Sequence, residues 1–421
     1  MQLTPSPSSE TNLRGRLGRA AALLLTAAGM PAAAHAAPGD PTLRVEASGL
    51  FYTEQQRTTI SEPIARITRL FSNGQTLSAQ FALDIMTGAS PTGANPAGVV
   101  QTSTSASGHT TTTQADALPT SKFSDNRGAL DLEWSAAWGR FSPTISGHFS
   151  REKDYRSLGF DGALSTDLNQ KLTTVTVGGG QNRDVVFPLH GIVAGLSGSD
   201  ARIADQADKR VNTALVGVSQ VLTRRWLIGV NVSRTWENGY LTEPYKVVSL
   251  LNANGIQTGT LREKRPDTRR RTSVQVNSAY HLTREVLSLS YRRYEDDWGV
   301  RSNTVDARYR IPYDNESWLE PHLRVYQQTA ADFFQQGFRD NAPRPTYASA
   351  DLRLGRLRTI TLGATYGFRV SDMPGEWYVR AEYMGQFGEA HPADAIGVQR
   401  TYNQAPVMHV GSVVVGWTFE R

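Results

Sequence analysis

The sequence of 421 residues contains no cysteine, which excludes a disulfide framework and a thiolate metal site. It is also poor in long hydrophobic runs. Hydrophobic residues make up 39% of the chain, and the mean hydropathy is −0.39, both low for a helical membrane protein. No stretch of the chain approaches the ~20 consecutive apolar residues that a membrane-spanning helix needs. The sequence therefore excludes a bundle of transmembrane helices.

Motifs of common enzymes and of nucleic-acid binding are missing as well. The chain has neither a G-x-S-x-G nucleophile elbow nor an H-E-x-x-H zinc motif. The net charge is +5, but no basic run is interleaved with aromatic residues as a base-stacking platform would require. We expect no enzymatic activity, no cofactor and no nucleic-acid partner. A catalytic set that includes His148, Ser150 or His322 stays open as an alternative.

The N-terminus has the three parts of a secretory signal peptide. Three arginines within residues 14–19 precede a short apolar core at 20–34, and Ala34-His35-Ala36 has the small-residue pattern of a cleavage site. The apolar core is too short to span a membrane. We predict a Sec signal peptide over residues 1–36, cleavage near Ala36, and a single mature domain over residues 37–421.

The mature chain is rich in alternating segments, most clearly at its end. In residues 407–421, Val413, Val415, Trp417 and Phe419 share one face, and smaller or polar residues share the other. A period of two that ends on aromatics near the C-terminus is typical of the last strand of an outer-membrane barrel. Because an open sheet edge cannot lie in lipid, this strand must pair with the first one.

Segments of this kind predict an all-β fold, a transmembrane antiparallel β-barrel of about 16 strands, within a range of 14–18. This count depends on a weak strand at 156–168 and on reading 350–370 as one long strand. Every long loop then falls on one side of the membrane and the short turns on the other, as in outer-membrane barrels. Residues 87–127 contain TSTSASGHTTTT and are expected to form a long mobile loop. A soluble sandwich or propeller is the alternative fold.

Alternation also predicts which charged residues face the lumen. On four neighbouring strands the inward arginines are Arg269, Arg271, Arg292, Arg308, Arg310 and Arg324. Asp131 and Glu133 face inward on a strand roughly opposite. A basic wall that faces an acidic wall would orient and select charged solutes. In the alternative, the arginines and acids pair locally and fill the lumen.

Three consecutive acids, Glu295, Asp296 and Asp297, are weak candidates for a calcium site at a strand end. Alternation points their side chains in different directions, so a solvated rim turn is the default and we expect no metal. Four tryptophans at strand ends are expected to lie at the membrane interface: Trp298, Trp318, Trp377 and Trp417.

Seven stretches of the chain resemble an uncharacterised Gram-negative outer-membrane barrel family known as domain of unknown function 3570. They are DIMTGASPTGA (84–94), SREKDYRSLGF (150–160), GYLTEPYKVV (239–248), EKRPDTRRR (263–271), YRRYEDDWGVRSNT (291–304), EPHLRVYQQTAADFF (320–334) and YASADLRLG (347–355). The resemblance implies an outer-membrane β-barrel. It implies no substrate or activity, so no catalytic or binding residue is carried over.

These observations predict a porin-like channel or transporter for small solutes, anions among them, in the outer membrane. The alternative is a non-conducting structural or partner-binding barrel whose lumen is plugged by residues 87–127 or by its own paired side chains. The expected partners are outer-membrane lipid and lipopolysaccharide, the barrel insertion machinery and the small solutes.

Overall fold

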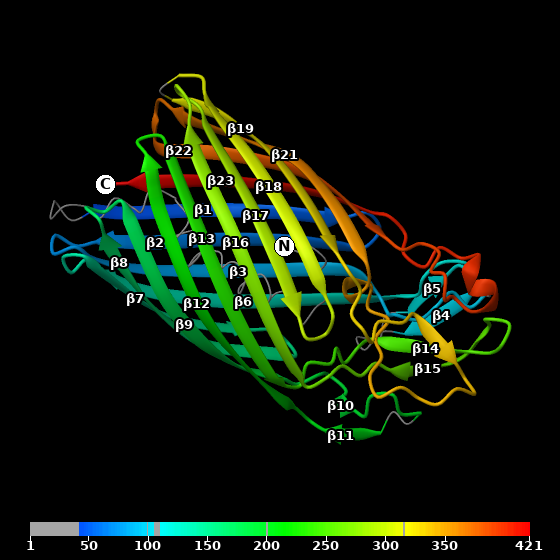
Figure 1. The fold of residues 1–421 in the computed structure, drawn as a ribbon. Coiled ribbons are helices and arrows are strands. Elements are labelled where there is room, and N and C mark those ends of the chain that lie inside the picture. Colours follow the sequence, from blue (N-terminus) through cyan, green and yellow to red (C-terminus); the bar gives the residue numbers. More distant parts are fainter. Residues whose placement is uncertain (1–41, 99, 105–109, 199–200, 315) are drawn as a thin grey trace.

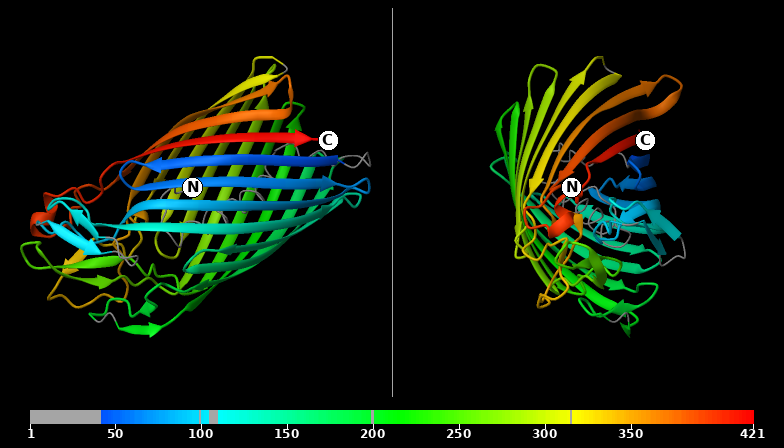
Figure 2. Two further views of the ribbon diagram at one scale, coloured as in Figure 1. Left: turned by 180° about the vertical axis from the view of Figure 1, so that it is seen from behind. Right: turned by 90° about the vertical axis from the view of Figure 1, so that its right-hand side faces the viewer.

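Sixteen antiparallel strands close into a barrel in a computed structural model of the chain (Figures 1 and 2). The structure describes residues 42–98, 100–104, 110–198, 201–314 and 316–421. The predicted signal peptide lies outside the described residues. The closed sheet confirms the predicted all-β antiparallel barrel and its strand count.

The barrel strands follow the chain order around the ring. The first eight are β1 (Thr42–Glu54), β2 (Thr58–Leu70), β3 (Gln75–Pro91), β6 (Thr120–Ala136), β7 (Phe141–Arg151), β8 (Tyr155–Leu168), β9 (Thr173–Val186) and β12 (Ala207–Thr223). The other eight are β13 (Trp226–Gly239), β16 (Thr268–His281), β17 (Val286–Asp296), β18 (Arg301–Pro312), β19 (Ser317–Gln328), β21 (Leu357–Val370), β22 (Met373–Gly388) and β23 (Met408–Glu420).

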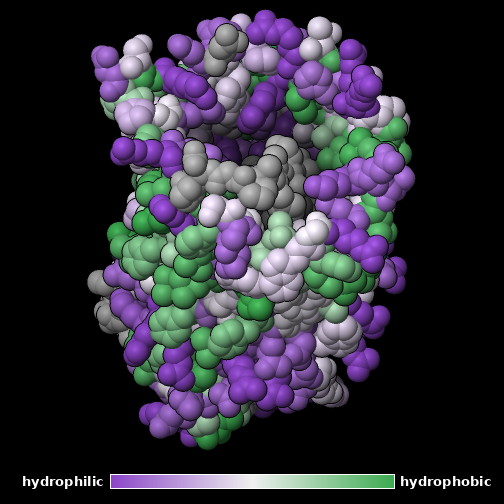
Figure 3. All heavy atoms as spheres, turned by 90° about the vertical axis from the view of Figure 1, so that its left-hand side faces the viewer, coloured by the Kyte–Doolittle hydropathy of each residue, from purple (hydrophilic) through white to green (hydrophobic). Residues whose placement is uncertain are grey.

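The ring closes where the sequence predicts, because β23 pairs with β1 from Arg44 opposite Glu420 to Glu54 opposite Val410. The outer face is apolar: Phe51, Ile145 and Phe160 are between 50% and 63% exposed. In Figure 3, seen from the end with the short turns, hydrophobic side chains gather across the middle of the view and hydrophilic ones surround a hollow at its top. An apolar outside and a polar inside match the two solvents that a barrel strand faces in a membrane.

The part of the chain that the structure describes includes no helix long and apolar enough to cross a membrane.

The two ends of the barrel differ. At one end the strands are joined by short turns, at residues 71–74, 137–140, 169–172, 224–225, 282–285, 313–316 and 371–372. All five long connections lie at the other end (Figure 1), as predicted: residues 92–119, 187–206, 240–267, 329–356 and 389–407. We call these five connections the cap.

The cap is folded. It contains the hairpin of β4 (Gln101–Thr104) and β5 (Thr110–Thr113), the pair of β10 (Ile192–Val193) and β11 (Arg202–Ala204), and a sheet of β15 (Gln257–Arg262), β14 (Val247–Leu251) and β20 (Gly337–Arg339). Two 3₁₀ helices, η1 (Leu352–Leu354) and η2 (Gly397–Arg400), complete it. In this sheet β14 pairs in parallel with β20, which joins two connections far apart in the sequence.

Buried contacts hold the connections of the cap to each other and to the barrel. An apolar cluster spans three connections and consists of Leu196, Val248, Leu261, Phe338, Ala348 and Ala350. The side chain of Gln399, only 1% exposed, donates to the carbonyl oxygens of Pro96 and Gly255. Gly93, with φ of +93°, lies so close to the connection at 240–267 that a Cβ there would lie 2.3 Å from the carbonyl oxygen of Val247. The described part of the cap is therefore a packed unit.

Two predicted boundaries differ from the structure. Residues 350–370 are not one strand, because β21 begins at Leu357 and the Asp351 side chain accepts from the backbone N–H of Arg353 to start η1. The loop expected at 87–127 is shorter, because β3 continues to Pro91 and β6 starts at Thr120. Apart from Phe123, these strand extensions consist of small or polar residues on both faces, so apolar alternation cannot mark them. The weak strand expected at 156–168 is present as β8.

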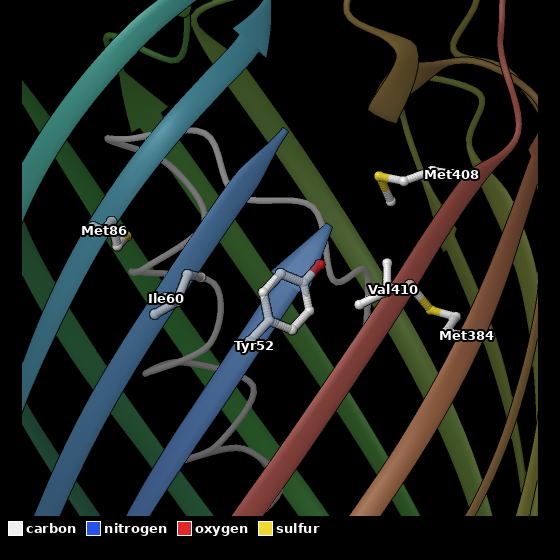
Figure 4. Close-up of a cluster of buried hydrophobic side chains, with 6 residues drawn as sticks. All are labelled: Tyr52, Ile60, Met86, Met384, Met408 and Val410. Atoms are coloured by element: carbon white, nitrogen blue, oxygen red, sulfur yellow. The ribbon is translucent and has the colours of Figure 1, made fainter. Parts of the chain in front are cut away.

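One part of the inner wall is apolar (Figure 4). Six side chains from β1, β2, β3, β22 and β23, each at most 4% exposed, pack together near the cap: Tyr52, Ile60, Met86, Met384, Met408 and Val410. Tyr52 points opposite to the exposed Phe51, which places the cluster on the lumen side. These strand ends are thus apolar on both faces.

Aromatic pairs occur at the short-turn end on the outer face. They are Trp134 with Trp138, Trp226 with Tyr280, and Trp377 with Trp417, with ring centroids 5.9 to 6.4 Å apart. Of the four tryptophans expected at the membrane interface, Trp377 and Trp417 belong to these pairs. For the other two, Trp298 and Trp318, the expectation was wrong. Trp298 is 4% exposed and packs against Phe333 of the cap. Trp318 lies on the inner face of β19, across the bare backbone of Gly367.

Candidate functional site: the lumen wall and the mouth of the barrel

The predicted arginines lie on one wall of the lumen, on four neighbouring strands. Arg269 and Arg271 are on β16, Arg292 on β17, Arg308 and Arg310 on β18, and Arg324 on β19. Each alternates with residues of the exposed outer face, and most contact inward acids on adjacent strands. The predicted arginine wall is therefore present. Its ion pairs decide how much of its positive charge is left uncompensated.

Near the cap, the arginines of this wall are neutralised. Arg269 contacts Asp296 of β17, with Nη2 and Oδ2 2.5 Å apart, and the Asp296 side chain is fully buried. Arg271 forms an ion pair with Glu237 of β13. Because both pairs are largely shielded from water, these two arginines act as cross-strand braces and not as free charges.

Nearer the short turns, three arginines share two carboxylates. Arg308 and Arg310 lie 3.7 Å and 3.0 Å from the two oxygens of Glu320. Arg308 and Arg324 each lie 3.4 Å from an oxygen of Asp306. The Arg308 and Arg310 side chains are 36% and 47% exposed. This cluster is partly open to water, so its charge is less shielded than that of the pairs near the cap.

His322 lies between two carboxylates of the same wall. Its Nε2 is 2.9 Å from Asp306 Oδ2, and its Nδ1 is 2.8 Å from Glu382 Oε1 on β22. Only the imidazolium form carries a proton on both nitrogens and can donate to both acceptors. The two carboxylates therefore favour the imidazolium form of His322, which would add a cation to this cluster.

Arg292, midway along the wall, differs from the other arginines. Its Nε donates to Ser273 Oγ at 2.7 Å, and its guanidinium lies 5.9 Å from the centre of the Tyr294 ring. Within the residues that the structure describes, no carboxylate forms an ion pair with it. Arg292 is the one predicted wall arginine whose described contacts are all with neutral groups.

The predicted acidic wall lies opposite, as the strand order shows. β6 is fourth and β18 twelfth of the sixteen strands, so the two are eight steps apart. Yet Asp131 is paired with His148, with Oδ1 and Nδ1 2.8 Å apart, and Glu133 lies 3.8 Å from Arg66. Both acids thus have local cationic or polar partners, which weakens any field across the lumen.

The residues around Asp131 also form a hydrogen-bonded chain on β6 and β7. His148 Nδ1 faces Asp131, and its Nε2 lies 3.2 Å from Ser150 Oγ. These contacts have the order of a Ser-His-Asp triad. However, Ser150 is only 2% exposed and its strand neighbour Ser157 is fully buried, which leaves no room for a substrate at the hydroxyl. The arrangement fits a buried polar network of the wall.

The three weak calcium candidates do not converge. Asp296 faces Arg269, an Asp297 oxygen accepts from the backbone N–H of Arg270, and Glu295 is on the outer face. A different acidic group lies at the mouth: Asp125, Glu152 and Asp154, all buried, have oxygens within 4.8 Å of one another. Asp154 Oδ2 accepts a hydrogen bond from Tyr245 of the cap at 2.6 Å. Burial, with Asp125 and Glu243 nearby, raises the pKa of Asp154 to about 6.

A cluster of buried charges lies in the cap and was not predicted. Arg265 contacts Glu263, with Nε and Oε1 2.6 Å apart, and Asp351, with Nη2 and Oδ2 2.8 Å apart. Arg353 binds Asp351 from the other side through Nε. Burial raises the pKa of Glu263, whereas Arg353 and other neighbouring cations hold the pKa of Asp351 far below its usual value against the effect of burial. We call Glu263, Arg265, Asp351 and Arg353 the latch.

A signal for the latch was present in the sequence. Its residues lie in two of the stretches that carry the family resemblance, EKRPDTRRR and YASADLRLG, and the neighbouring Lys246 lies in a third, GYLTEPYKVV. Charged residues in such stretches that fall outside the alternating strands are candidates for buried ion pairs between loops. Which loops meet could not be read from alternation.

Comparison with known proteins adds the following. The family model described as "Protein of unknown function (DUF3570)" matches residues 15–413. No curated protein matches the sequence. Among solved structures, the barrel is similar to Pseudomonas aeruginosa OpdK with vanillate, at 7% identity and a TM-score of 0.41, over 91% of this chain and 99% of that one. It is also similar to P. aeruginosa OccK2 (OpdF) in complex with glucuronate, at 9% identity and a TM-score of 0.40, over 90% and 98% of the chains. The family match spans nearly the whole chain, and the protein belongs to the DUF3570 family, with the fold of a sixteen-strand outer-membrane barrel.

Proposed function

We propose that this protein is a passive channel for small solutes across the outer membrane, with a preference for anions. The observation that carries the proposal is the closed sixteen-strand barrel with charged side chains along its inner face. Barrels of this strand number are wide enough to enclose an aqueous path. A wall with many charged groups is stable when it faces water, since unpaired charge is costly only where water is excluded.

The charge of the short-turn half of the lumen supports the anion preference. Arg308, Arg310 and Arg324 share Asp306 and Glu320, while His322 joins Asp306 to Glu382. With Arg292 nearby and without a described acidic partner, cations exceed carboxylates on this wall. An anion that passes close to it would be stabilised by the uncompensated charge.

A closed barrel is the second candidate, and the buried latch favours it. Four nearly water-free charged groups tie together two connections of the cap at the mouth. A cap held in this way would narrow or block the entrance. The plugging element would then be the whole cap and not residues 87–127 alone.

Solute efflux from liposomes tests the proposal. The refolded mature protein is reconstituted, and vesicles are loaded with neutral, cationic or anionic sugars of equal size. We expect efflux above that of empty vesicles, fastest for the anionic sugar. No efflux of any sugar from vesicles that contain folded protein would favour the closed barrel. Efflux at equal rates for all three would retain the channel and remove the anion preference.

A further inference from the structure

A small cavity of about 40 Å³ lies where the cap meets the rim of the barrel. Its wall includes Arg57 from the β1–β2 turn, Ser90 and Pro91 from the end of β3, and Lys246, Asp351 and Arg353 from the cap. This volume has room for about three water molecules. It therefore has room for the head group of a small solute as well.

Lys246 is a buried cation held only by neutral groups. It is 7% exposed, and its Nζ donates to Ser90 Oγ at 3.0 Å and to the carbonyl oxygen of Pro91. Over the described ranges, no carboxylate lies within ion-pair distance of this ammonium. Burial lowers the pKa of Lys246 more than the nearby carboxylates of Asp351, Glu243 and Glu263 raise it, and none of the three forms an ion pair with the ammonium.

Arg57 lines the same cavity and, like Lys246, forms no ion pair with a described carboxylate. Its Nη1 donates to Met408 Sδ at 3.4 Å, a weak acceptor, and no ion pair to a carboxylate is formed among the residues whose positions the structure gives. Burial lowers the pKa of Arg57 despite the opposing effect of Glu54. Two cations from separate parts of the chain therefore meet at one cavity without a salt bridge.

The neighbouring latch contains a buried cation that does have carboxylate partners, and so allows a comparison with Lys246. Arg265 is as buried as Lys246, but Glu263 and Asp351 raise its pKa above the usual value against the effect of burial. The two sites share the same surroundings, so burial alone does not explain the difference. The difference is one of contact: two carboxylates form ion pairs with Arg265, and none of the described carboxylates forms one with Lys246.

The charges that line the cavity define the missing partner. The lining holds three cations, Arg57, Lys246 and Arg353, and two carboxylates, Glu54 and Asp351. Cations therefore exceed carboxylates by one in the lining itself, while Glu243 and Glu263 act on Lys246 from outside the lining. A forked guanidinium and an ammonium match the two oxygens of a planar carboxylate, which accepts charge-assisted hydrogen bonds from both.

We propose that this cavity binds one small monovalent oxyanion of the carboxylate class, with Lys246 and Arg57 as its ligands. The site lies at the mouth, where a solute would pass from the cap to the lumen. The proposal deepens the proposed function, because it names a solute class and an entry point. Binding at the site can be measured without transport.

The test is the binding of acetate labelled with ¹³C to the folded protein in detergent, followed by the line width of the acetate signal at constant ionic strength. We expect saturable broadening in the wild type and at least a tenfold loss of affinity in Arg57→Gln and in Lys246→Met. Arg356→Gln, a cap arginine with a 68% exposed side chain, is the matched control and should bind as the wild type does. Because Lys246 is buried, Arg57→Gln keeps the test valid if Lys246→Met does not fold.

Three results would overturn the proposal: no saturable binding of acetate to the wild type, unchanged affinity in Arg57→Gln, or equal competition by chloride. The last would make the cavity a general anion site and not a carboxylate site. Efflux without acetate binding would leave the channel standing and remove the subsite. Acetate binding without efflux would leave the subsite standing and remove the channel.

Discussion

The two ends of the lumen use the same residue types in different surroundings. In the latch, the side chains of Arg265, Glu263 and Asp351 are 8%, 0% and 4% exposed. Near the short turns, the side chains of Arg308 and Arg310 are 36% and 47% exposed. An ion pair between an arginine and a carboxylate therefore differs in energetic contribution between the two ends, and burial decides its size.

Desolvation explains the difference. Removing one partner of a buried ion pair leaves a charge without water or counter-charge, which costs about 3–5 kcal/mol. An exposed pair contributes about 0–1 kcal/mol, because water screens it. The latch should therefore control the structure of the cap, and the open cluster should control which ions pass.

The largest effect is expected from breaking the latch with Arg265→Gln. Glu263 would keep only neutral donors, the Ser349 hydroxyl and the backbone N–H of Glu243. We expect the free energy of cap opening to fall by about 3–5 kcal/mol. Hydrogen exchange of amides in 240–267 and 347–356 measures this change, with Arg356→Gln as the control. Unchanged protection in Arg265→Gln would show that the latch does not hold the cap.

A smaller effect is expected from pH, through Asp154 beneath the cap. Its pKa is about 6 in the folded protein, above its ordinary value of 3.8, because of burial. The folded state thus binds more protons than the unfolded state between about pH 4 and 6, and stability falls as pH rises through this window. Two pKa units correspond to about 3 kcal/mol. Above about pH 7 no further loss is expected.

The pH effect is measured by the protection of amides near Tyr245, which donates to Asp154. Protection, corrected for the intrinsic exchange rate, should decrease from pH 4.5 to 7. In Asp154→Asn, which cannot ionise but still offers an acceptor to Tyr245, it should be flat. A wild-type profile as flat as that of the variant would contradict the assignment.

A third substitution should alter the charge of the open cluster, formed by Arg308, Arg310 and Arg324 with Asp306 and Glu320, and leave the latch intact. Neutralising one charge near an ion in water is worth about 1 kcal/mol, or about fivefold. We expect Arg310→Gln to lower the ratio of anion to cation permeability by about this factor and to leave the exchange of cap amides unchanged. Glu320→Gln, which removes the partner of Arg310, should raise the ratio. Reversal potentials in a KCl gradient give both values, and a shift in the same direction for both variants would exclude an electrostatic cause.

The smallest effect is expected for Ser150→Ala in the buried chain of Asp131 and His148. Loss of one hydrogen bond should lower the free energy of unfolding by about 1 kcal/mol and leave conductance unchanged. The midpoint of heat-induced unfolding, seen as a change in gel mobility, measures the stability. Ester hydrolysis by the wild type that this variant abolishes would instead identify the chain as a catalytic triad.

Most of the barrel could be predicted because lipid and water impose a period of two on each strand. Val413 and Val415 alternate with residues of the opposite face, and β23 pairs with β1 as that pattern requires. The inward positions of Arg308 and Arg324 follow from the same alternation. Where both faces are mostly polar, as in Thr120–Asn126, or both apolar, as around Tyr52, the pattern carries no such information.

The ion pairs and the cap could not be predicted. Whether Arg271 is free or bound to Glu237 depends on the side chains near it on β13, where Glu237 lies diagonally and not directly opposite, and the sequence alone leaves both open. The latch depends on a contact between two connections, and its residues Arg265 and Asp351 are 86 positions apart in the sequence. Such contacts follow from three-dimensional packing and not from local periodicity.

Single-channel recording in planar bilayers, with the wild type and Arg265→Gln side by side, is the most direct test of a water-filled lumen beneath a latched cap. We predict steady, anion-selective conductance in the wild type and a larger mean conductance in the variant, whose cap opens more easily. Folded, inserted protein that stays silent in both forms would contradict the channel.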